Sequence, residues 1–153
     1  MIFLTAILGV CSSAFALDNR ENMPSFQLQG IDGRFYDSTE FKKSELLAIV
    51  FLSNHCPTSQ IFQHRIIRLA KEYRNKGLAV IAISPNDPEA ILPDELSHSA
   101  LGDTLPEMAL RAKELQYPFL YLYDGKTQKV AKAYGVRVTP HAFLFDKERK
   151  LRY

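Results

Sequence analysis

Cysteine is scarce in this sequence of 153 residues, which contains two, and tryptophan is absent. Cys11 lies in an apolar N-terminal stretch and Cys56 lies well inside the chain. If the N-terminal stretch is removed, Cys56 is the only thiol left, and an internal disulfide is excluded. An unpaired cysteine is unusual in an exported protein unless its thiol is reactive or inaccessible.

A strong net charge is also lacking. The chain carries 19 Lys and Arg against 17 Asp and Glu, a net charge of +2, and no basic run stands out. Contact with a phosphate backbone depends on clustered cations, so we expect no nucleic-acid partner. With 46% hydrophobic and 24% charged residues, the composition suits one globular domain. Nothing in the sequence indicates a cofactor.

The first sixteen residues contain no charged side chain. The apolar run 2–10 and the small residues that end at Ala16 are typical of a secretory signal peptide. The stretch is shorter than a comfortable membrane span, so we expect membrane contact only if it stays uncleaved. The sequence thus predicts a signal peptide over 1–16, a mature domain over 17–153, and a periplasmic or secreted location.

A continuous apolar run, 46–52, leads to Cys56 and then to an amphipathic segment over 57–73. An apolar run without alternation is typical of a strand buried on both faces, and the second segment has helical periodicity. The expected buried face of this helix consists of Phe62, Ile66, Leu69, Ala70 and Tyr73. Free N–H groups and partial positive charge at a helix start favour an anion, so they favour a thiolate at Cys56.

A second apolar run over 78–83 completes a strand–helix–strand unit. The long connection 84–116 follows, with a helix expected from about residue 105 to 115. A connection of this length is typical of an insertion near a functional face. The remaining predicted elements are an edge hairpin over 25–36, strands over 119–123 and 141–145, and a helix over 127–134. The chain stops inside the hairpin partner of the last strand, so we expect the natural protein to continue past Tyr153.

Four stretches together resemble the thioredoxin-like superfamily, and within it the peroxiredoxin-like redoxins of the alkyl hydroperoxide reductase and thiol-specific antioxidant group. They are 54–57, 118–124, 130–135 and 139–146. The resemblance implies an α/β class and a thioredoxin-like fold. Its central mixed sheet is flanked by helices, with an insertion before the fourth main strand and an incomplete C-terminus.

The resemblance also implies roles for residues around Cys56. Thr139 and Pro140 match the cis-proline site beside the active cysteine, where an exposed backbone edge can pair with a substrate chain. Ser53 matches the hydroxyl residue that precedes the peroxide-reacting cysteine. Arg137 lies three residues before the position where the family's arginine is expected. We take Ser53, Thr139, Pro140 and Arg137 as candidate substrate contacts.

Two departures from the family pattern bear on turnover. Ser59 stands where a dithiol thioredoxin has its second cysteine, so an internal resolving thiol is lost. Ile49 stands where peroxiredoxins have a proline. Ser59 can still donate a hydrogen bond to the thiolate, and His55 can lower the thiol pKa or pass a proton. Cys56, His55 and Ser59 are therefore the candidate catalytic residues.

These observations favour an exported thiol oxidoreductase with one redox-active cysteine. It would reduce a peroxide or exchange disulfides, with an external thiol as resolving partner and reductant. Whether the chain is an enzyme at all stays open at this point. One alternative is a non-catalytic thioredoxin-like binding module of a larger protein. Another is a copper or zinc domain that would use Cys56 with His55 or His141.

Overall fold

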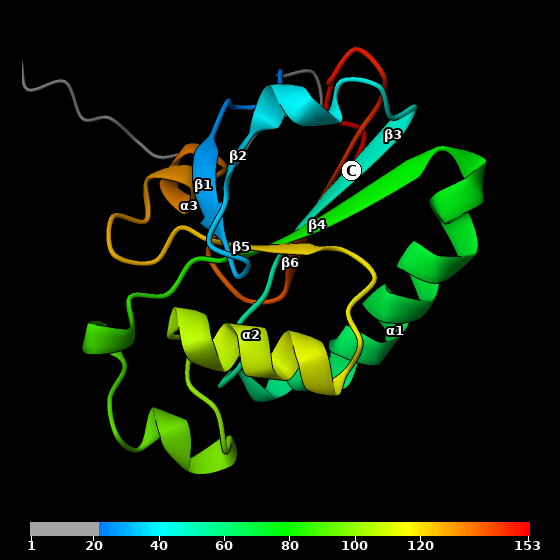
Figure 1. The fold of residues 1–153 in the computed structure, drawn as a ribbon. Coiled ribbons are helices and arrows are strands. Elements are labelled where there is room, and N and C mark those ends of the chain that lie inside the picture. Colours follow the sequence, from blue (N-terminus) through cyan, green and yellow to red (C-terminus); the bar gives the residue numbers. More distant parts are fainter. Residues whose placement is uncertain (1–21) are drawn as a thin grey trace, which may run out of the picture.

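A computed structural model describes residues 22–153, and the predicted signal peptide lies outside this range. Six strands form one sheet in the order β2-β1-β5-β4-β3-β6 (Figure 1). The strands are β1 (Gln27–Gly30), β2 (Phe35–Asp37), β3 (Leu46–Phe51), β4 (Leu78–Ser84), β5 (Leu120–Tyr123) and β6 (His141–Phe145). The α-helices are α1 (Pro57–Tyr73), α2 (Leu105–Glu114) and α3 (Lys129–Ala133). Short 3-10 turns are η1 (Ser38–Phe41), η2 (Arg74–Lys76), η3 (Pro88–Ala90) and η4 (Glu95–His98).

Strand β3 lies inside the sheet, between β4 and β6. It is parallel to β4, with Phe51 opposite Ile83, and antiparallel to β6, with Phe51 opposite His141. Strands β4 and β5 are also parallel, whereas β1 joins β5 in the antiparallel sense. The sheet is therefore mixed, as predicted. A short loop connects the carboxyl end of β3 to Cys56.

The two faces of the sheet carry separate hydrophobic clusters because alternate side chains of each strand point to opposite sides. Leu47, Ile49 and Phe51 of β3 pack with α3 on one face. Ala48 and Val50 pack with α1 and α2 on the other face. Both faces are covered, which explains why the β3 sequence is apolar without alternation.

The buried face of α1 matches the predicted one only in part, because Ala70 is buried and Ile66 packs against the core but the other three predicted residues are largely exposed. Phe62, Leu69 and Tyr73 are 38%, 43% and 42% exposed, whereas the buried stripe consists of Ser59, Gln63, Ile67 and Ala70. These four positions follow one another at helical spacing. The first of them, Ser59, is bonded to the loop after β3. This contact sets the rotation of the helix about its axis, and apolar spacing alone does not reveal it.

The other local predictions are largely confirmed. The edge hairpin is β1 with β2, and the helix expected from about residue 105 is α2, which begins with a capping box between Thr104 and Glu107. The helix α3 begins later than predicted, and the Asp124 carboxylate accepts the N–H groups of Val130 and Ala131 at its start. The partner of β6 is present only as a bridge between Phe145 and Leu151.

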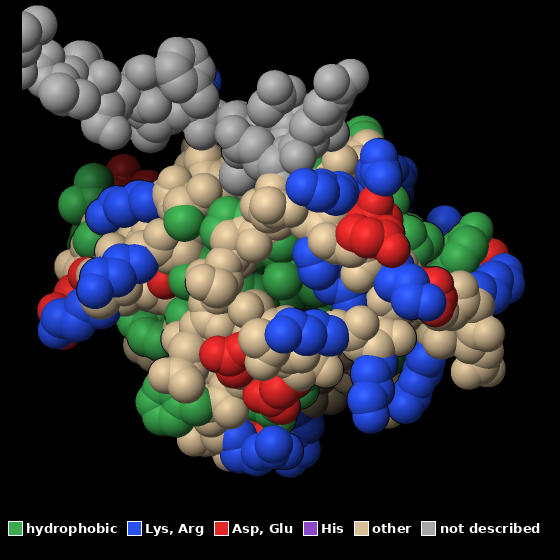
Figure 2. All heavy atoms as spheres, turned by 90° about the horizontal axis from the view of Figure 1, so that it is seen from above, with side chains coloured by type: hydrophobic (Ala, Val, Ile, Leu, Met, Phe, Trp, Pro, Cys, Tyr) green, Lys and Arg blue, Asp and Glu red, His purple; other side chains and the backbone are tan. Residues whose placement is uncertain are grey.

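The surface of the described residues shows no dominant basic patch on the face drawn in Figure 2, where Lys and Arg side chains are spread out with Asp and Glu between them. Within residues 22–153, no helix has the length and apolar character needed to cross a membrane.

Candidate active site

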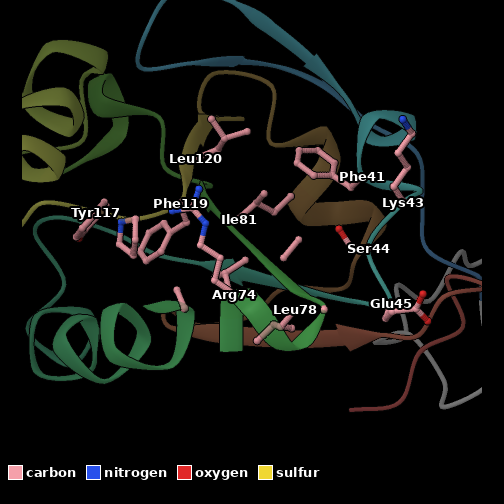
Figure 3. A pocket seen from close by; sticks show the side chains of 15 residues that line it. Phe41, Lys43, Ser44, Glu45, Arg74, Leu78, Ile81, Tyr117, Phe119 and Leu120 are labelled. Atoms are coloured by element: carbon pink, nitrogen blue, oxygen red, sulfur yellow. The ribbon is translucent and has the colours of Figure 1, made fainter. Parts of the chain in front are cut away.

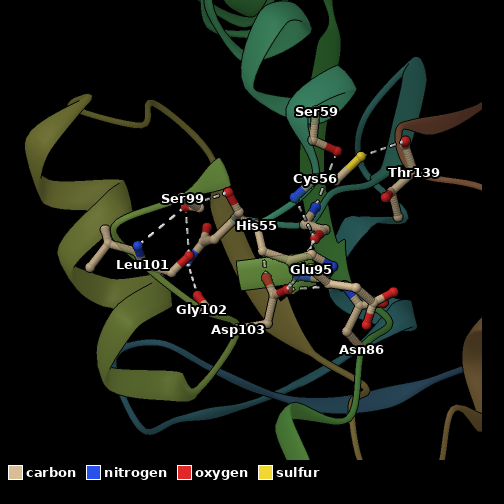
Figure 4. A network of polar contacts seen from close by, with 12 residues as sticks. His55, Cys56, Ser59, Asn86, Glu95, Ser99, Leu101, Gly102, Asp103 and Thr139 are labelled. Carbon is tan, nitrogen blue, oxygen red and sulfur yellow. Dashed lines mark hydrogen bonds and ion pairs between the residues drawn. The ribbon is translucent and has the colours of Figure 1, made fainter. Parts of the chain in front are cut away.

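Cys56 occupies the N-cap position of α1, directly before Pro57. Its side chain points toward the loop before β6, where Sγ lies 3.1 Å from the carbonyl oxygen of Thr139 (Figure 4). The Thr139–Pro140 peptide bond is cis. The thiol is only partly buried. Residues 83 positions apart thus meet at one sulfur.

The surroundings of Cys56 favour its thiolate. Burial by itself raises the pKa of Cys56, but hydrogen bonds from the Thr139 hydroxyl, from both the N–H and hydroxyl of Ser59, and from the Thr58 N–H outweigh burial. The Thr139 carbonyl acts the other way, since it accepts the thiol proton. The donors prevail, and the pKa of Cys56 lies below its ordinary value.

Ser59 occupies the place of the second cysteine in a dithiol motif. It is 2% exposed, and its Oγ accepts the Ser53 N–H at 3.3 Å. Cys56 is the free cysteine of the described residues. Ser59 therefore supports the loop and the thiolate, but it has no sulfur that could attack a mixed disulfide.

Asp103 is the centre of a polar network around the loop that leads to Cys56 (Figure 4). Its side chain is fully buried. The Asn54 N–H donates to Oδ1 at 2.6 Å, and the Ser53 hydroxyl and the Asn86 amide donate to Oδ2, each at 3.0 Å. The His55 ring nitrogen Nδ1 also bonds to Oδ2. Ser53 Oγ in turn accepts the Cys56 N–H at 3.2 Å, which links the carboxylate to the cysteine backbone.

Further bonds join the loop 53–56 to the long connection after β4. The Asn54 amide donates to the Gly102 carbonyl at 2.7 Å, and the Ser99 hydroxyl donates to the Asn54 carbonyl at 3.2 Å. The insertion expected near a functional face therefore contacts the loop that carries Cys56. Sequence reasoning did not identify Asp103, Asn86 or Ser99. The one sequence feature that could have pointed to Asp103 is its position directly before the capping box of α2.

The remaining candidate residues are Arg137 and His141. Arg137 is exposed, and among residues 22–153 its side chain takes part in no recorded hydrogen bond or ion pair. The His141 ring lies against Phe143 with centroids 4.5 Å apart, and burial lowers the pKa of His141. No group of three or more His, Cys, Asp or Glu side chains in the described residues could hold a metal ion.

One hollow of the described residues is separate from the thiol. It has a volume of about 620 Å³ and lies where β3 and β4 begin, the opposite end of these strands from Cys56 (Figure 3). Phe41, Arg74, Tyr117 and Phe119 are among its lining residues. The reactive group with a lowered pKa is the Cys56 thiol, which does not line this hollow.

Comparisons with known proteins support the fold. Two solved structures are similar over most of the chain. A hypothetical protein from Sinorhizobium meliloti has 36% identity and a TM-score of 0.79, over 91% of this chain and 70% of that one. An uncharacterized conserved protein from Geobacillus kaustophilus has 37% identity and a TM-score of 0.79, over 89% of this chain and 67% of that one.

A thiol-disulfide oxidoreductase from Bacteroides fragilis shares the fold at 20% identity, with a TM-score of 0.68 over 87% of this chain and 88% of that one. No protein with curated annotation matches the chain. The model of the AhpC/TSA family matches residues 20–153. The chain therefore belongs to the AhpC/TSA family of thioredoxin-like redoxins.

Proposed function

We propose that this redoxin is a thiol oxidoreductase in which Cys56 alone carries the redox chemistry and an external thiol completes each turnover. The observation that carries the proposal is the state of Cys56. Its sulfur is partly exposed at the start of α1, and hydrogen-bond donors from Thr58, Ser59 and Thr139 lower its pKa. A thiolate that solvent can reach is the nucleophile that peroxide or disulfide chemistry requires.

With a peroxide, the thiolate attacks the terminal oxygen. An S–O bond forms, the O–O bond breaks, and the leaving oxygen takes a proton, which gives an alcohol or water and a sulfenic acid on Cys56. One external thiol then condenses with the sulfenic acid and releases water. A second external thiol attacks that mixed disulfide, which regenerates the Cys56 thiol and releases the external disulfide. Two electrons pass from the two external thiols to the peroxide.

With a disulfide, Cys56 attacks one sulfur and the other leaves as a thiol, and an external thiol again resolves the mixed disulfide. Because Ser59 replaces the second cysteine, both routes need the external thiol. The Thr139 backbone beside the sulfur supports a substrate contact at this edge. The roles of Pro140, Ser53 and Arg137 toward substrate, and the periplasmic or secreted location with antioxidant activity, belong to the same proposal.

The proposal is tested by stopped-flow mixing of the reduced protein with hydrogen peroxide and, separately, with a small mixed disulfide. We expect second-order reaction with at least one of them at about tenfold or more the rate of free cysteine, because more of the thiol is ionised at neutral pH. Steady-state turnover is expected to depend on the concentration of an added monothiol.

Cys56→Ser provides the control, and it is expected to abolish both reactions without unfolding the protein. If the wild-type thiol reacts no faster than free cysteine with either oxidant, the catalytic proposal is wrong. The non-catalytic binding module then becomes the better description.

A further inference from the structure

The hollow drawn in Figure 3 lies where two neighbouring strands begin at different heights. Strand β4 begins at Leu78, but its parallel neighbour β5 begins only at Leu120, opposite Ile81. Pro118, just before β5, has no N–H group and cannot donate to the edge of β4. The first three residues of β4 are therefore paired with β3 on one side, and on the other side they line the hollow.

The backbone of Leu78 is left without a strand partner on the open side. Neighbouring residues of a strand direct their N–H and C=O groups to opposite sides. The Ile83 carbonyl accepts the Leu52 N–H, from the β3 side. The Ser84 carbonyl accepts the Asp124 N–H, from the β5 side. Leu78 shares the orientation of Ser84, and the described residues contain no strand partner for its N–H and C=O groups.

Small residues at this end of the sheet leave room for the hollow. Ala70, Gly77 and Ala79 line it. Gly77 has a φ of 87°, and a Cβ atom there would lie 3.1 Å from Cβ and Cγ of Glu45, so only glycine suits this turn into β4. The volume of about 620 Å³ falls in the range of ligand pockets, about 300–1,000 Å³. Such pockets have mainly apolar walls, as here, where the larger apolar side chains are Phe41, Leu78, Val80, Ile81, Tyr117, Phe119 and Leu120.

The charged groups of the lining favour an anion. They are Lys43, Glu45 and Arg74. The Glu45 carboxylate is bonded to Lys147 Nζ at 3.0 Å, so its charge is opposed. Figure 3 shows the Arg74 side chain pointing into the hollow. Among the described residues, the ion pairs do not include Arg74, so no carboxylate of this part of the chain occupies its guanidinium.

We propose that this hollow binds a small amphipathic anion, a molecule with an apolar chain or ring and one carboxylate. The apolar part lies against Phe41, Tyr117 and Phe119. The carboxylate bonds to the Arg74 guanidinium, whose paired N–H groups match its two oxygens, and the Leu78 N–H is a further donor. Both the apolar walls and the inward-pointing cation are then used.

This site goes beyond the proposed redox function and does not depend on it. The hollow lies at the start of β3 and Cys56 follows its end, and the strand between them has six residues, about 20 Å of extended chain. A purely structural role for Arg74 is the competing explanation, because a cation at the end of α1 also opposes the negative end of the helix dipole. That role predicts no effect of Arg74 on ligand binding.

The experiment titrates the 15N-labelled protein with decanoate, below its micelle concentration, and follows the amide signals by nuclear magnetic resonance. We expect saturable shifts centred on the hollow, at Leu78, Val80 and Phe119. Decanol has a chain of the same length without the charge, and acetate has the charge without the chain. Each is expected to bind about tenfold more weakly than decanoate or worse, because each satisfies only one part of the site.

Two variants and one control separate the parts of the site. Arg74→Gln is expected to weaken decanoate binding about three- to tenfold and to leave decanol binding unchanged, because only the charged contact is lost. Arg68→Gln is the matched control, since Arg68 is an exposed residue of the same helix that does not line the hollow. Ala79→Leu fills part of the hollow and is expected to weaken decanoate binding about tenfold.

No saturable decanoate binding, or shifts centred away from the hollow, overturns the inference. Equal affinities for decanoate and decanol overturn the assignment of an anion, and equal losses in Arg74→Gln and Arg68→Gln overturn the role of Arg74. If Ala79→Leu does not fold, the shift map and the two arginine variants decide. Binding is measured without peroxide or disulfide, so failure of the proposed redox function is seen separately.

Discussion

At the scale of single residues, the state of Cys56 results from opposing contributions. Burial and the Thr139 carbonyl favour the neutral thiol, whereas the Thr139 hydroxyl, with Ser59 and Thr58 at the first turn of α1, favours the thiolate. Ser59 has two roles, because its hydroxyl supports the thiolate and its Oγ also accepts the Ser53 N–H. Ser59 therefore takes the place of an internal resolving thiol and also lowers the pKa of Cys56.

Ser59→Ala tests this dual role. We expect the pKa of Cys56 to rise, because one hydrogen-bond donor to the thiolate is lost. The free energy of unfolding is expected to fall by about 1–3 kcal/mol, because the buried Ser53 N–H loses its acceptor. Ultraviolet titration of the thiolate and urea unfolding measure the two effects.

Thr58→Ala is the matched control, because Thr58 contributes through its backbone N–H, which the substitution keeps. An equal rise in the pKa of Cys56 for both variants would contradict the role of the Ser59 hydroxyl.

The lowered pKa of Cys56 also makes the stability of the folded chain depend on pH. Since the pKa of Cys56 is lowered in the folded chain, its stabilising contribution is complete above the unfolded-state pKa and is lost as pH falls through the folded-state pKa. In Ser59→Ala, this pH-dependent part of the stability is expected to shrink.

At the scale of elements, helix α1 shows how a polar contact can fix a helix that apolar spacing leaves ambiguous. Apolar residues are distributed around much of its circumference, so more than one face can pack on the sheet. The bond between Ser59 and Ser53 selects the face that includes Gln63, Ile67 and Ala70. The orientation of α1, and hence of the cysteine at its start, is set by the active-site loop.

Ile67→Ala and Leu69→Ala test the orientation of α1. Ile67 is 7% exposed and Leu69 is 43% exposed. We expect Ile67→Ala to lower the free energy of unfolding by about 2–4 kcal/mol, because a buried aliphatic side chain leaves a cavity. Leu69→Ala is expected to cost less than about 1 kcal/mol. Urea unfolding of both variants measures the difference, and the reverse order would support the face predicted from periodicity.

At the scale of the whole molecule, distant segments meet on each face of the sheet. On the face that α3 covers, the buried Tyr134 ring packs against Phe51, Phe143 and Phe145. Its hydroxyl donates to the Pro24 carbonyl at 2.8 Å, 110 positions away. Burial raises the pKa of Tyr134 above its ordinary range, so this hydroxyl remains a donor. The contact attaches the N-terminal segment to the core.

Tyr134→Phe keeps the aromatic packing and removes only this hydrogen bond. We expect the free energy of unfolding to fall by about 1 kcal/mol, because the partly buried Pro24 carbonyl loses its donor. Tyr73→Phe is the control on a half-exposed tyrosine, and it is expected to change stability by less than about 0.5 kcal/mol. Thermal or urea unfolding measures both, and no difference between them would contradict the proposed attachment.

Much of the architecture follows from local pattern. The apolar runs over 46–52 and 78–83, the Asp-Gly turn of the edge hairpin and the helix expected from about residue 105 predict strands and helices that the structure confirms. The position of Cys56 at a helix start also follows from sequence, because a strand, a polar loop and Pro57 in the first helical turn are all visible there. These features depend on residues close together in the chain.

The Asp103 network and the rotation of α1 were decided only by the tertiary structure. The bonds of Asp103 to Ser53, Asn54 and His55 span about 50 positions, and the contact of Cys56 with Thr139 spans 83. Local periodicity carries no information about which carboxylate of a long insertion becomes buried. Burial in turn decides which donors must surround it, because an unpaired buried charge is costly. The sequence by itself determined the position of the thiol at a helix start, and only the folded chain determined which distant groups surround it, because a contact such as that of Cys56 with Thr139 depends on tertiary packing.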